Sequence, residues 1–259
     1  MSSVGTRVLA SLAVPVVLVA LWWVVSSGSA SPYFPPLPDI VEGFAETWTA
    51  DRLRGDLVPS LVALAVGFVI AVLVGMLGGI VLGLSPRLRR DVRPLTEFLR
   101  ATPVVALVPL GLVLLGPGTT MEIALIAFAG TWPILIAAVD GVRAADQVAL
   151  DTARVYGLSP ARRLVQVVVP GAMPQIMAGV RIAVAASVGT MVVANMLASG
   201  AGLGYVVIRA QQSFNILDTW SGLLMIGLVG CSVTGLVVTV ERMVLGWHRR
   251  WRALDQRSA

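Results

Sequence analysis

Long apolar runs, separated by short polar segments, follow one another along almost the whole chain. A helix needs roughly 20 apolar residues to cross the hydrocarbon core of a bilayer, and most of the runs approach or exceed that length. We therefore predict an all-α membrane protein with six transmembrane helices, at residues 8–25, 59–84, 101–116, 121–139, 182–198 and 221–245. The third run holds Pro103 and Pro109, but a membrane helix tolerates proline where neighbouring helices satisfy the freed carbonyl groups.

The first run has two readings. It follows Arg7 and could be a secretory signal, but Trp22 and Trp23 close it and no small-residue cleavage site comes directly after its core. We interpret it as an uncleaved helix. Residues 1–58 then form the first transmembrane helix and an external loop, residues 59–250 the transmembrane core, and residues 251–259 a cytoplasmic tail. Within the external loop we expect a short interfacial helix from Asp39 to Thr49.

Composition narrows the possible chemistry. Of the 259 residues 57% are apolar and 13% charged, and the mean hydropathy is +0.87, which excludes a soluble globular domain. The sequence contains arginine but no lysine, so the lysine of a phosphate-binding loop or of a Schiff-base enzyme is missing. Cys231 and His248 are the sole residues of their types, which leaves no internal disulfide and no Cys/His zinc cluster. We predict no catalytic residue, no metal site and no cofactor on this chain.

The arginines also set the expected orientation. If both termini are cytoplasmic, all the arginines except Arg52, Arg54 and Arg209 fall on the cytoplasmic side. Such an asymmetry is the normal topology signal of membrane proteins. We therefore interpret the net charge of +5 as a topology signal and not as a nucleic-acid-binding surface.

Small residues recur every four positions in the second predicted span. Spacing of four places them on one helix face, where missing side chains let another backbone approach closely. The face serves either packing within the subunit or movement between subunits. Its members are Ala63, Gly67, Ala71, Gly75, Gly79 and Gly83.

A polar face is predicted in the fifth span. Ser187, Met191 and Asn195 share it at spacing four, and Thr190 lies beside it. An amide in contact with lipid is costly, so this face should point inward. It either makes an interhelical hydrogen bond or lines a translocation path.

The longest predicted loop runs from Asp140 to Arg181. Apolar residues recur in it at helical spacing, and Gly157 with Ser159-Pro160 predicts two short helices that meet at a bend. A helix pair with one apolar face has to bury that face, either on its own membrane domain or on a partner.

This loop resembles the EAA signature of ABC importer permeases. Asp151-Thr152-Ala153, then Gly157 after three residues, then Val167-Val168-Val169-Pro170 after nine, keep the spacing of that signature. Asp151 and Thr152 stand where the signature has glutamate and alanine. The resemblance implies the ATP-binding-cassette importer permease fold and a loop that forms a coupling helix against an ATPase subunit. The implied coupling residues are Asp151, Ala153, Arg154, Gly157 and Pro170.

Motifs over about residues 35–250 are similar to one branch, the permeases for nitrate, sulfonates and taurine. They include Arg100-Ala101-Thr102-Pro103, Trp132-Pro133 and the glycine-rich segment 200–204. Ala63 replaces an arginine that is frequent there, and Asn195 replaces the usual glutamate. The resemblance implies a multi-pass permease of the bacterial plasma membrane that works as a homodimer. It also implies two ATPase subunits carrying ATP and Mg, and an external solute-binding protein.

A second function class is a self-sufficient secondary carrier or channel. Such proteins usually place ionisable residues deep in the membrane. Within the predicted spans this sequence has none near the middle, since Glu122, Asp140, Arg181 and Glu241 all fall near predicted helix ends. An intramembrane enzyme is disfavoured by the lack of a catalytic pair. The sequence therefore favours a permease subunit that is not itself an enzyme.

Overall fold

The computed structural model describes residues 4–246, with side chains from Ala13 onward, and the described part of the chain is helical with short connections. The first half holds α1 (Val4–Ser27), α2 (Leu37–Thr47), α3 (Ala50–Arg52), the π-helical turn η1 (Leu53–Leu57), α4 (Val58–Leu84), α5 (Pro86–Ala101) and α6 (Val104–Leu115). The second half holds α7 (Thr119–Arg143), α8 (Gln147–Val155), α9 (Pro160–Arg163), the π-turn η2 (Leu164–Val168), α10 (Val169–Ala198), α11 (Leu203–Gln212) and α12 (Ile216–Val244).

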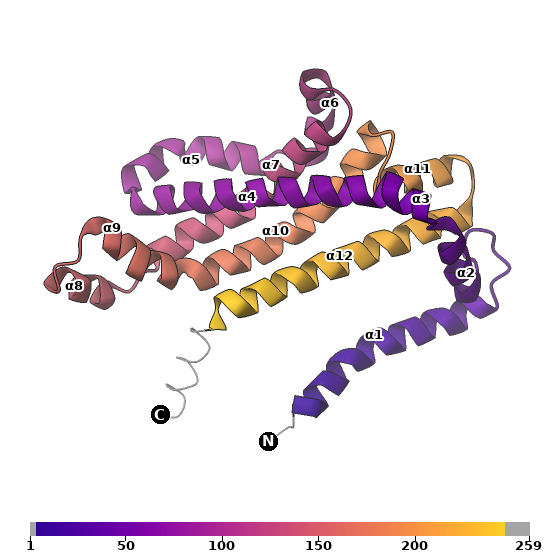
Figure 1. Ribbon diagram of the computed structural model, residues 1–259, viewed down its shortest axis with the longest axis horizontal. Coiled ribbons are helices and arrows are strands. Elements are labelled where there is room, and N and C mark those ends of the chain that lie inside the picture. The colour runs from indigo at the N-terminus through magenta and orange to yellow at the C-terminus, as the bar shows by residue number, and fades with distance from the viewer. Residues whose placement is uncertain (1–3, 247–259) are drawn as a thin grey trace.

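Three long helices, α4, α7 and α10, pack against one another along their lengths (Figure 1). The helix α7 contacts both others and is the central member. Contacts between α4 and α7 advance in step along both helices, so these two run parallel, whereas α10 runs antiparallel to α7. The predicted all-α membrane fold is confirmed.

Glycines bring α4 and α7 into backbone contact. A Cβ atom at Gly79 would lie 2.5 Å from Ala138 Cβ and 2.6 Å from the Leu135 carbonyl oxygen. The predicted face of small residues therefore lies against α7 of the same chain. Equally close approaches, with Ile126, Ile134 and Val142 as the respective neighbours, occur at Gly67, Gly75 and Gly83.

Within the described residues, four helices are long and apolar enough to cross a membrane. They are residues 50–84, 119–143, 160–198 and 216–244, and α5 with α6 adds a fifth crossing if the bent pair is taken as one span. Because α4 and α7 are parallel, α5 and α6 have to return the chain between them. The helix α1 continues apolar from Ala13 to Ser27, and the predicted total of six spans remains a prediction.

The third predicted span, 101–116, is not one continuous helix, because the chain breaks at residues 102–103. Its helical part is α6, only 12 residues long, and α6 makes an angle of 93° with α5. Pro103 explains the break, since proline disfavours helical geometry at Thr102 before it, which adopts extended backbone. At 1.5 Å per residue α6 alone covers about 18 Å, too short for a core of about 30 Å.

The predicted loop 140–181 is also shorter than expected. The helix α10 begins at Val169, well before Ile182, and it continues from α9 through the π-turn η2. Pro170 comes directly after the π-turn η2, where the regular hydrogen-bond pattern of the helix is already interrupted, and the helix continues through it. Only α8 and its short connections to α7 and α9 remain outside the long helices.

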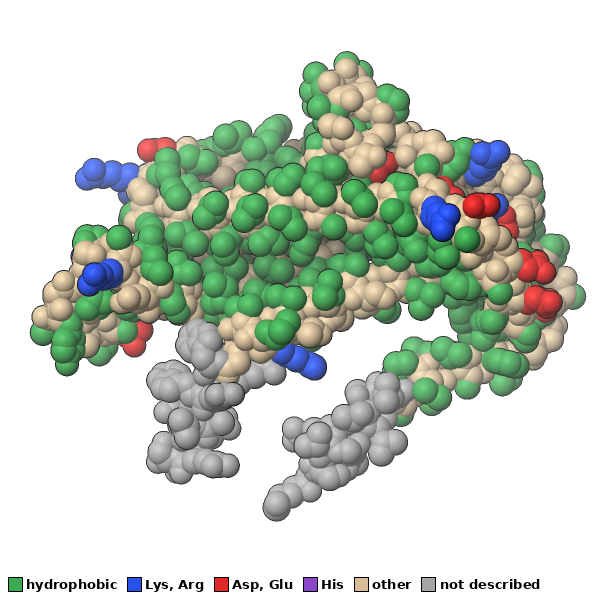
Figure 2. Space-filling view, in the orientation of Figure 1, with side chains coloured by type: hydrophobic (Ala, Val, Ile, Leu, Met, Phe, Trp, Pro, Cys, Tyr) green, Lys and Arg blue, Asp and Glu red, His purple; other side chains and the backbone are tan. Residues whose placement is uncertain are grey.

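Charged residues gather at the two ends of the long axis, and apolar side chains cover the flank between them (Figure 2). The end with α8 and α9 carries Arg162 and Arg163. Arg181 lies further along α10, close to Gly179, which contacts Pro133 and Ala137 in the middle of α7, and it pairs with Glu241 to join α10 to α12. The opposite end carries α2, α3 and α11 (Figure 1). The helix α1 lies apart from the long helices, and its outer end is attached through Trp22, whose ring packs against Trp220 at 5.6 Å.

Candidate functional site

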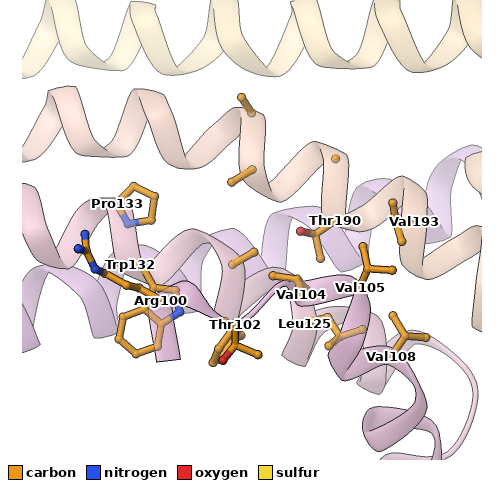
Figure 3. Close-up of a pocket in the computed structure, with 15 residues that line it drawn as sticks. Arg100, Thr102, Val104, Val105, Val108, Leu125, Trp132, Pro133, Thr190 and Val193 are labelled. Carbon is orange, nitrogen blue, oxygen red and sulfur yellow. The ribbon is translucent and has the colours of Figure 1, made fainter. Parts of the chain in front are cut away.

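A cavity of about 380 Å³ opens between the bent pair α5–α6 and the helices α7 and α10 (Figure 3). Most of its wall is apolar, with Val104, Val105 and Val108 from α6 opposite Ala185, Gly189 and Val193 from α10. The bend at Pro103 shapes this space, because α6 leaves the direction of α5 at 93° and packs against α7 and α10 beyond the bend. The cavity is therefore a direct product of the broken helix.

A few polar groups stand at one end of this cavity. Arg100 and Thr102 come from the end of α5, and Trp132 comes from the middle of α7 (Figure 3). Among the described residues the Trp132 indole nitrogen is buried without a hydrogen-bond partner, and Arg100 is paired with Glu97 at 2.6 Å. A mostly apolar pocket with a few converging polar groups is the usual form of a small-molecule site.

The four residues predicted for a path separate in the structure. Thr190 lines the cavity, whereas Ser187, Met191 and Asn195 are completely buried inside the chain. Met191 packs with Ala63 and Ile126 from α4 and α7. The polar face does point away from lipid, but it faces the core of the three-helix unit and not the cavity.

Asn195 instead takes part in a buried hydrogen-bond network at the end that carries α2, α3 and α11. The Ser60 hydroxyl lies 2.9 Å from Asn195 Oδ1 and 3.0 Å from the Asp56 carbonyl, and it accepts from Leu203 N at 3.0 Å. Asp56 Oδ1 accepts from Gly202 N at 2.9 Å. Together these bonds join α4, α10 and the turn before α11.

Gly202 makes this network possible. Its φ is +109°, a region that side chains rarely adopt, and an added Cβ would lie 2.6 Å from Asn195 Oδ1. The glycine-rich segment 200–204 stood out in the sequence, but nothing in its spacing could show that it meets Ser60. The Glu122 carboxyl, 3% exposed, also lies in this region beside the side chains of Ser199 and Asn195.

The helix pair α8–α9 bends at Gly157, as the sequence predicted. Leu158 N donates to Ala153 O and Gly157 N to Arg154 O, which together form a Schellman motif with Gly157 at φ +70°. No atom lies within 4 Å of a Cβ built on Gly157, so the glycine is required for its backbone conformation and not for space within the chain.

The other residues proposed for coupling are placed differently from one another. Ala153 is buried on the chain itself, while Asp151 and Arg154 are exposed and form an ion pair with each other. Pro170 lies in the first turn of α10, away from the bend. The outer surface of the pair is apolar instead at Val148, Val155 and Tyr156, which are 73%, 86% and 79% exposed.

A multi-helix membrane domain with an internal cavity and an exposed helix pair at one end defines a class of transport proteins. Residues 67–245 match the family model described as the binding-protein-dependent transport system inner membrane component, and the chain belongs to that family. The resemblance to ABC importer permeases stated from the motifs is thereby confirmed. The chain is a multi-pass membrane protein of this transport-subunit family.

Curated relatives cover nearly the whole chain. The taurine transport system permease protein TauC of Escherichia coli (strain K12) is 31% identical over 253 residues, covering 93% of this chain and 90% of TauC. The aliphatic sulfonates permease SsuC of Bacillus subtilis (strain 168), described as putative in its name, is 29% identical over 93% of this chain and 88% of its own length. The bicarbonate permease CmpB of Synechococcus elongatus is 32% identical, covering 87% and 85%.

Solved structures share the fold. A chain of the MetNI methionine ABC transporter in an inward-facing conformation aligns with a TM-score of 0.58 at 19% identity, covering 80% of this chain and 97% of that one. A chain of an amino acid ABC transporter aligns at a TM-score of 0.51 and 18% identity.

Proposed function

We propose that this chain is the permease subunit of an ATP-driven importer for a small solute of the nitrate, sulfonate or taurine type. The observation that carries the proposal is the family match over residues 67–245, which includes the cavity and the helix pair. Two copies would form the membrane domain. Two ATPase subunits with ATP and Mg would bind inside, and a solute-binding protein outside.

In this proposal α8 and α9 receive the ATPase. The apolar side chains around Gly157 provide a contact surface, and the short connections to α7 and α10 transmit movement to the long helices. The arginine distribution supports a cytoplasmic position for this end and for both termini.

The cavity is the proposed part of the path. Thr190, Arg100 and Trp132 supply its polar contacts, and its volume of about 380 Å³ limits the solute to a small one. The relatives whose names mention sulfonates, taurine and bicarbonate support a solute with an oxyanion group.

The test is reconstitution of the chain in proteoliposomes with its ATPase and binding protein. Taurine, nitrate and bicarbonate serve as probes, with ATP on the ATPase side. We expect uptake that requires ATP and all components, and an ATPase that copurifies with the tagged chain. Ion-gradient-driven uptake by the chain alone would instead establish the carrier or channel, and no association with an ATPase would refute the permease assignment.

A further inference from the structure

Arginines of α5 line the groove between α5 and α7, on the side of α5 opposite its apolar face. Arg89, Arg90 and Arg93 of α5 and Arg143 at the end of α7 line a cavity of about 510 Å³ near the α8–α9 end. The apolar face of α5 points the other way, with Leu95 56% and Phe98 69% exposed.

On a soluble protein, an amphipathic helix turns its apolar face toward the protein and its charged face outward. The helix α5 has the reverse arrangement. An amphipathic helix turns its apolar face toward the apolar phase, so the outer side of α5 is suited to lipid or a second copy of the chain. Its arginines line the open groove next to α7, where the Arg93 side chain is 76% exposed. Charged groups at membrane depth are found where they line a water-filled cavity, and they commonly mark ion or substrate pathways.

The groove continues to the middle of the membrane domain. A further cavity of about 420 Å³ shares Glu97 and Ile136 with the arginine-lined one, and shares Arg100, Trp132 and Pro133 with the cavity beside Thr190. From Arg89 to Arg100 the helix rises about 16 Å, roughly half of a bilayer core. Arg100 thus lies level with Trp132, the middle of α7.

The charges do not cancel along this groove. Glu97 pairs with Arg100 at 2.6 Å and is 4.0 Å from Arg93, and Asp140 is 3.9 Å from Arg143. Among the side chains that the structure describes, Arg89 and Arg90 have no carboxylate partner. Arginine stays protonated at all physiological pH values and offers paired donors that match an oxyanion. The remaining positive charge is therefore permanent.

We propose that the α5–α7 groove binds small oxyanions, with Arg89, Arg90 and Arg93 as the anion-binding residues, and that it is the cytoplasmic half of the solute path. The second part rests on the proposed permease function, whereas anion binding in the groove does not. The ligand class is a singly charged sulfonate, nitrate or bicarbonate. A lipid phosphate group has related chemistry, and the experiment has to separate the two.

The test reads the local potential with thiol reagents of opposite charge. Thr96 also lines the groove, and Thr96→Cys in a Cys231→Ser background gives one thiol there. The purified chain in neutral detergent is treated with two methanethiosulfonate reagents. One carries an anionic sulfonatoethyl group, and the other carries a cationic trimethylammonium-ethyl group. The ratio of their rates is compared with that of the exposed outer variant Ser213→Cys.

We expect the groove thiol to prefer the anionic reagent. Adding Arg89→Gln or Arg93→Gln should lower the rate ratio by roughly sevenfold per charge, because one unit charge about 7 Å away in water changes each rate by about threefold and the two rates in opposite directions. Arg242→Gln on α12 removes the same charge away from the groove and should leave the ratio unchanged. Gel filtration verifies that each variant is folded, and the two arginine variants provide independent measurements.

Ethanesulfonate and phosphatidylglycerol distinguish the sources of the anion. Slowing of the anionic reaction by millimolar ethanesulfonate, lost in Arg93→Gln, supports the proposal. Protection by phosphatidylglycerol alone identifies a lipid headgroup and overturns the solute assignment. A ratio equal to that of Ser213→Cys, or one that ignores both arginine variants, refutes the anion site. None of these results alters whether an ATPase copurifies with the chain, so the permease function is tested separately.

Discussion

Ser60 and Asn195, 135 positions apart in sequence, are both fully buried and lie within hydrogen-bond distance, 2.9 Å from Oγ to Oδ1. The Ser60 hydroxyl also accepts from Leu203 N, whereas Asn195 makes no other hydrogen bond through its oxygen among the described residues. The serine is therefore the more connected of the two. The consequences of removing each side chain differ accordingly.

We predict that Ser60→Ala destabilises the chain more than Asn195→Leu does. The alanine leaves Leu203 N and Asn195 Oδ1 buried without a partner, at about 1–3 kcal/mol for each unsatisfied group. With leucine at 195, Ser60 can still donate to the Asp56 carbonyl. Thermal unfolding in detergent measures the order. Equal stability of the two variants would contradict the central position of Ser60.

Uptake assays then decide the role of Asn195. Because its side chain faces α4, Asn195→Leu should impair uptake less than Thr190→Leu, which fills part of the cavity. Assembly with the ATPase should persist in both. A stronger uptake defect in Asn195→Leu than in Thr190→Leu, at equal protein levels, would show that the Asn195 side chain contributes to the translocation path.

Two adjacent glycines in α4 form a matched pair for the packing of α4 on α7. A Cβ at Gly79 meets a backbone oxygen at 2.6 Å, which cannot yield, whereas a Cβ at Gly78 meets only Leu135 Cδ1 at 3.6 Å. We expect Gly79→Ala to lower the free energy of unfolding by about 1–3 kcal/mol. Gly78→Ala should be neutral or stabilising through helix propensity. A similar stability of both variants would show that the contact is looser than described.

For Gly157 the structure separates backbone conformation from contact. Gly157→Asn keeps a positive φ accessible and should fold normally, while Gly157→Glu adds bulk and charge at the surface proposed for the ATPase. The glutamate variant should insert in the membrane but lose more than about 2 kcal/mol of ATPase binding. Binding affinity and ATP-dependent uptake are the measurements. Normal transport by Gly157→Glu would refute the coupling role of this bend.

The orientation is testable with single cysteines in a Cys231→Ser background. Ser31, Ser213 and Ser159 are all exposed, so each substituted thiol is sterically accessible. In sealed cells an impermeant thiol reagent should label Ser31→Cys and Ser213→Cys, and should label Ser159→Cys only after lysis. Labelling at 159 in intact cells would invert the topology derived from the arginines.

The sequence was sufficient to predict an all-α membrane fold, because the length of each apolar run can be read from neighbouring residues alone. The ranges of α7 and α12 and the bend at Gly157 follow from hydropathy and glycine placement. Three features depended on tertiary geometry and were not predictable. These are the 93° break before α6, the extension of α10 through Pro170, and the role of α5, whose arginines were assigned to a loop.

The same limit applied to the site. Helical spacing correctly predicted that Asn195 points away from lipid. The pattern of one helix cannot show whether such a residue packs in the core of its own chain or lines a path. Arg100 and Trp132 were noticed as motif residues without a role, because the cavity that unites them exists only after α6 bends.

The backbone contacts along α4, α7 and α10 also have a mechanical consequence. Gly79 and Gly179 let α7 touch main-chain or β-carbon atoms on both neighbours, leaving little side-chain volume to deform. The three helices therefore form one rigid unit, and α8 is joined to α7 by a short connection. If α8 receives the ATPase as proposed, its movement should rotate the three helices as one body, with hinges expected at their attachments to α6, α11 and α12.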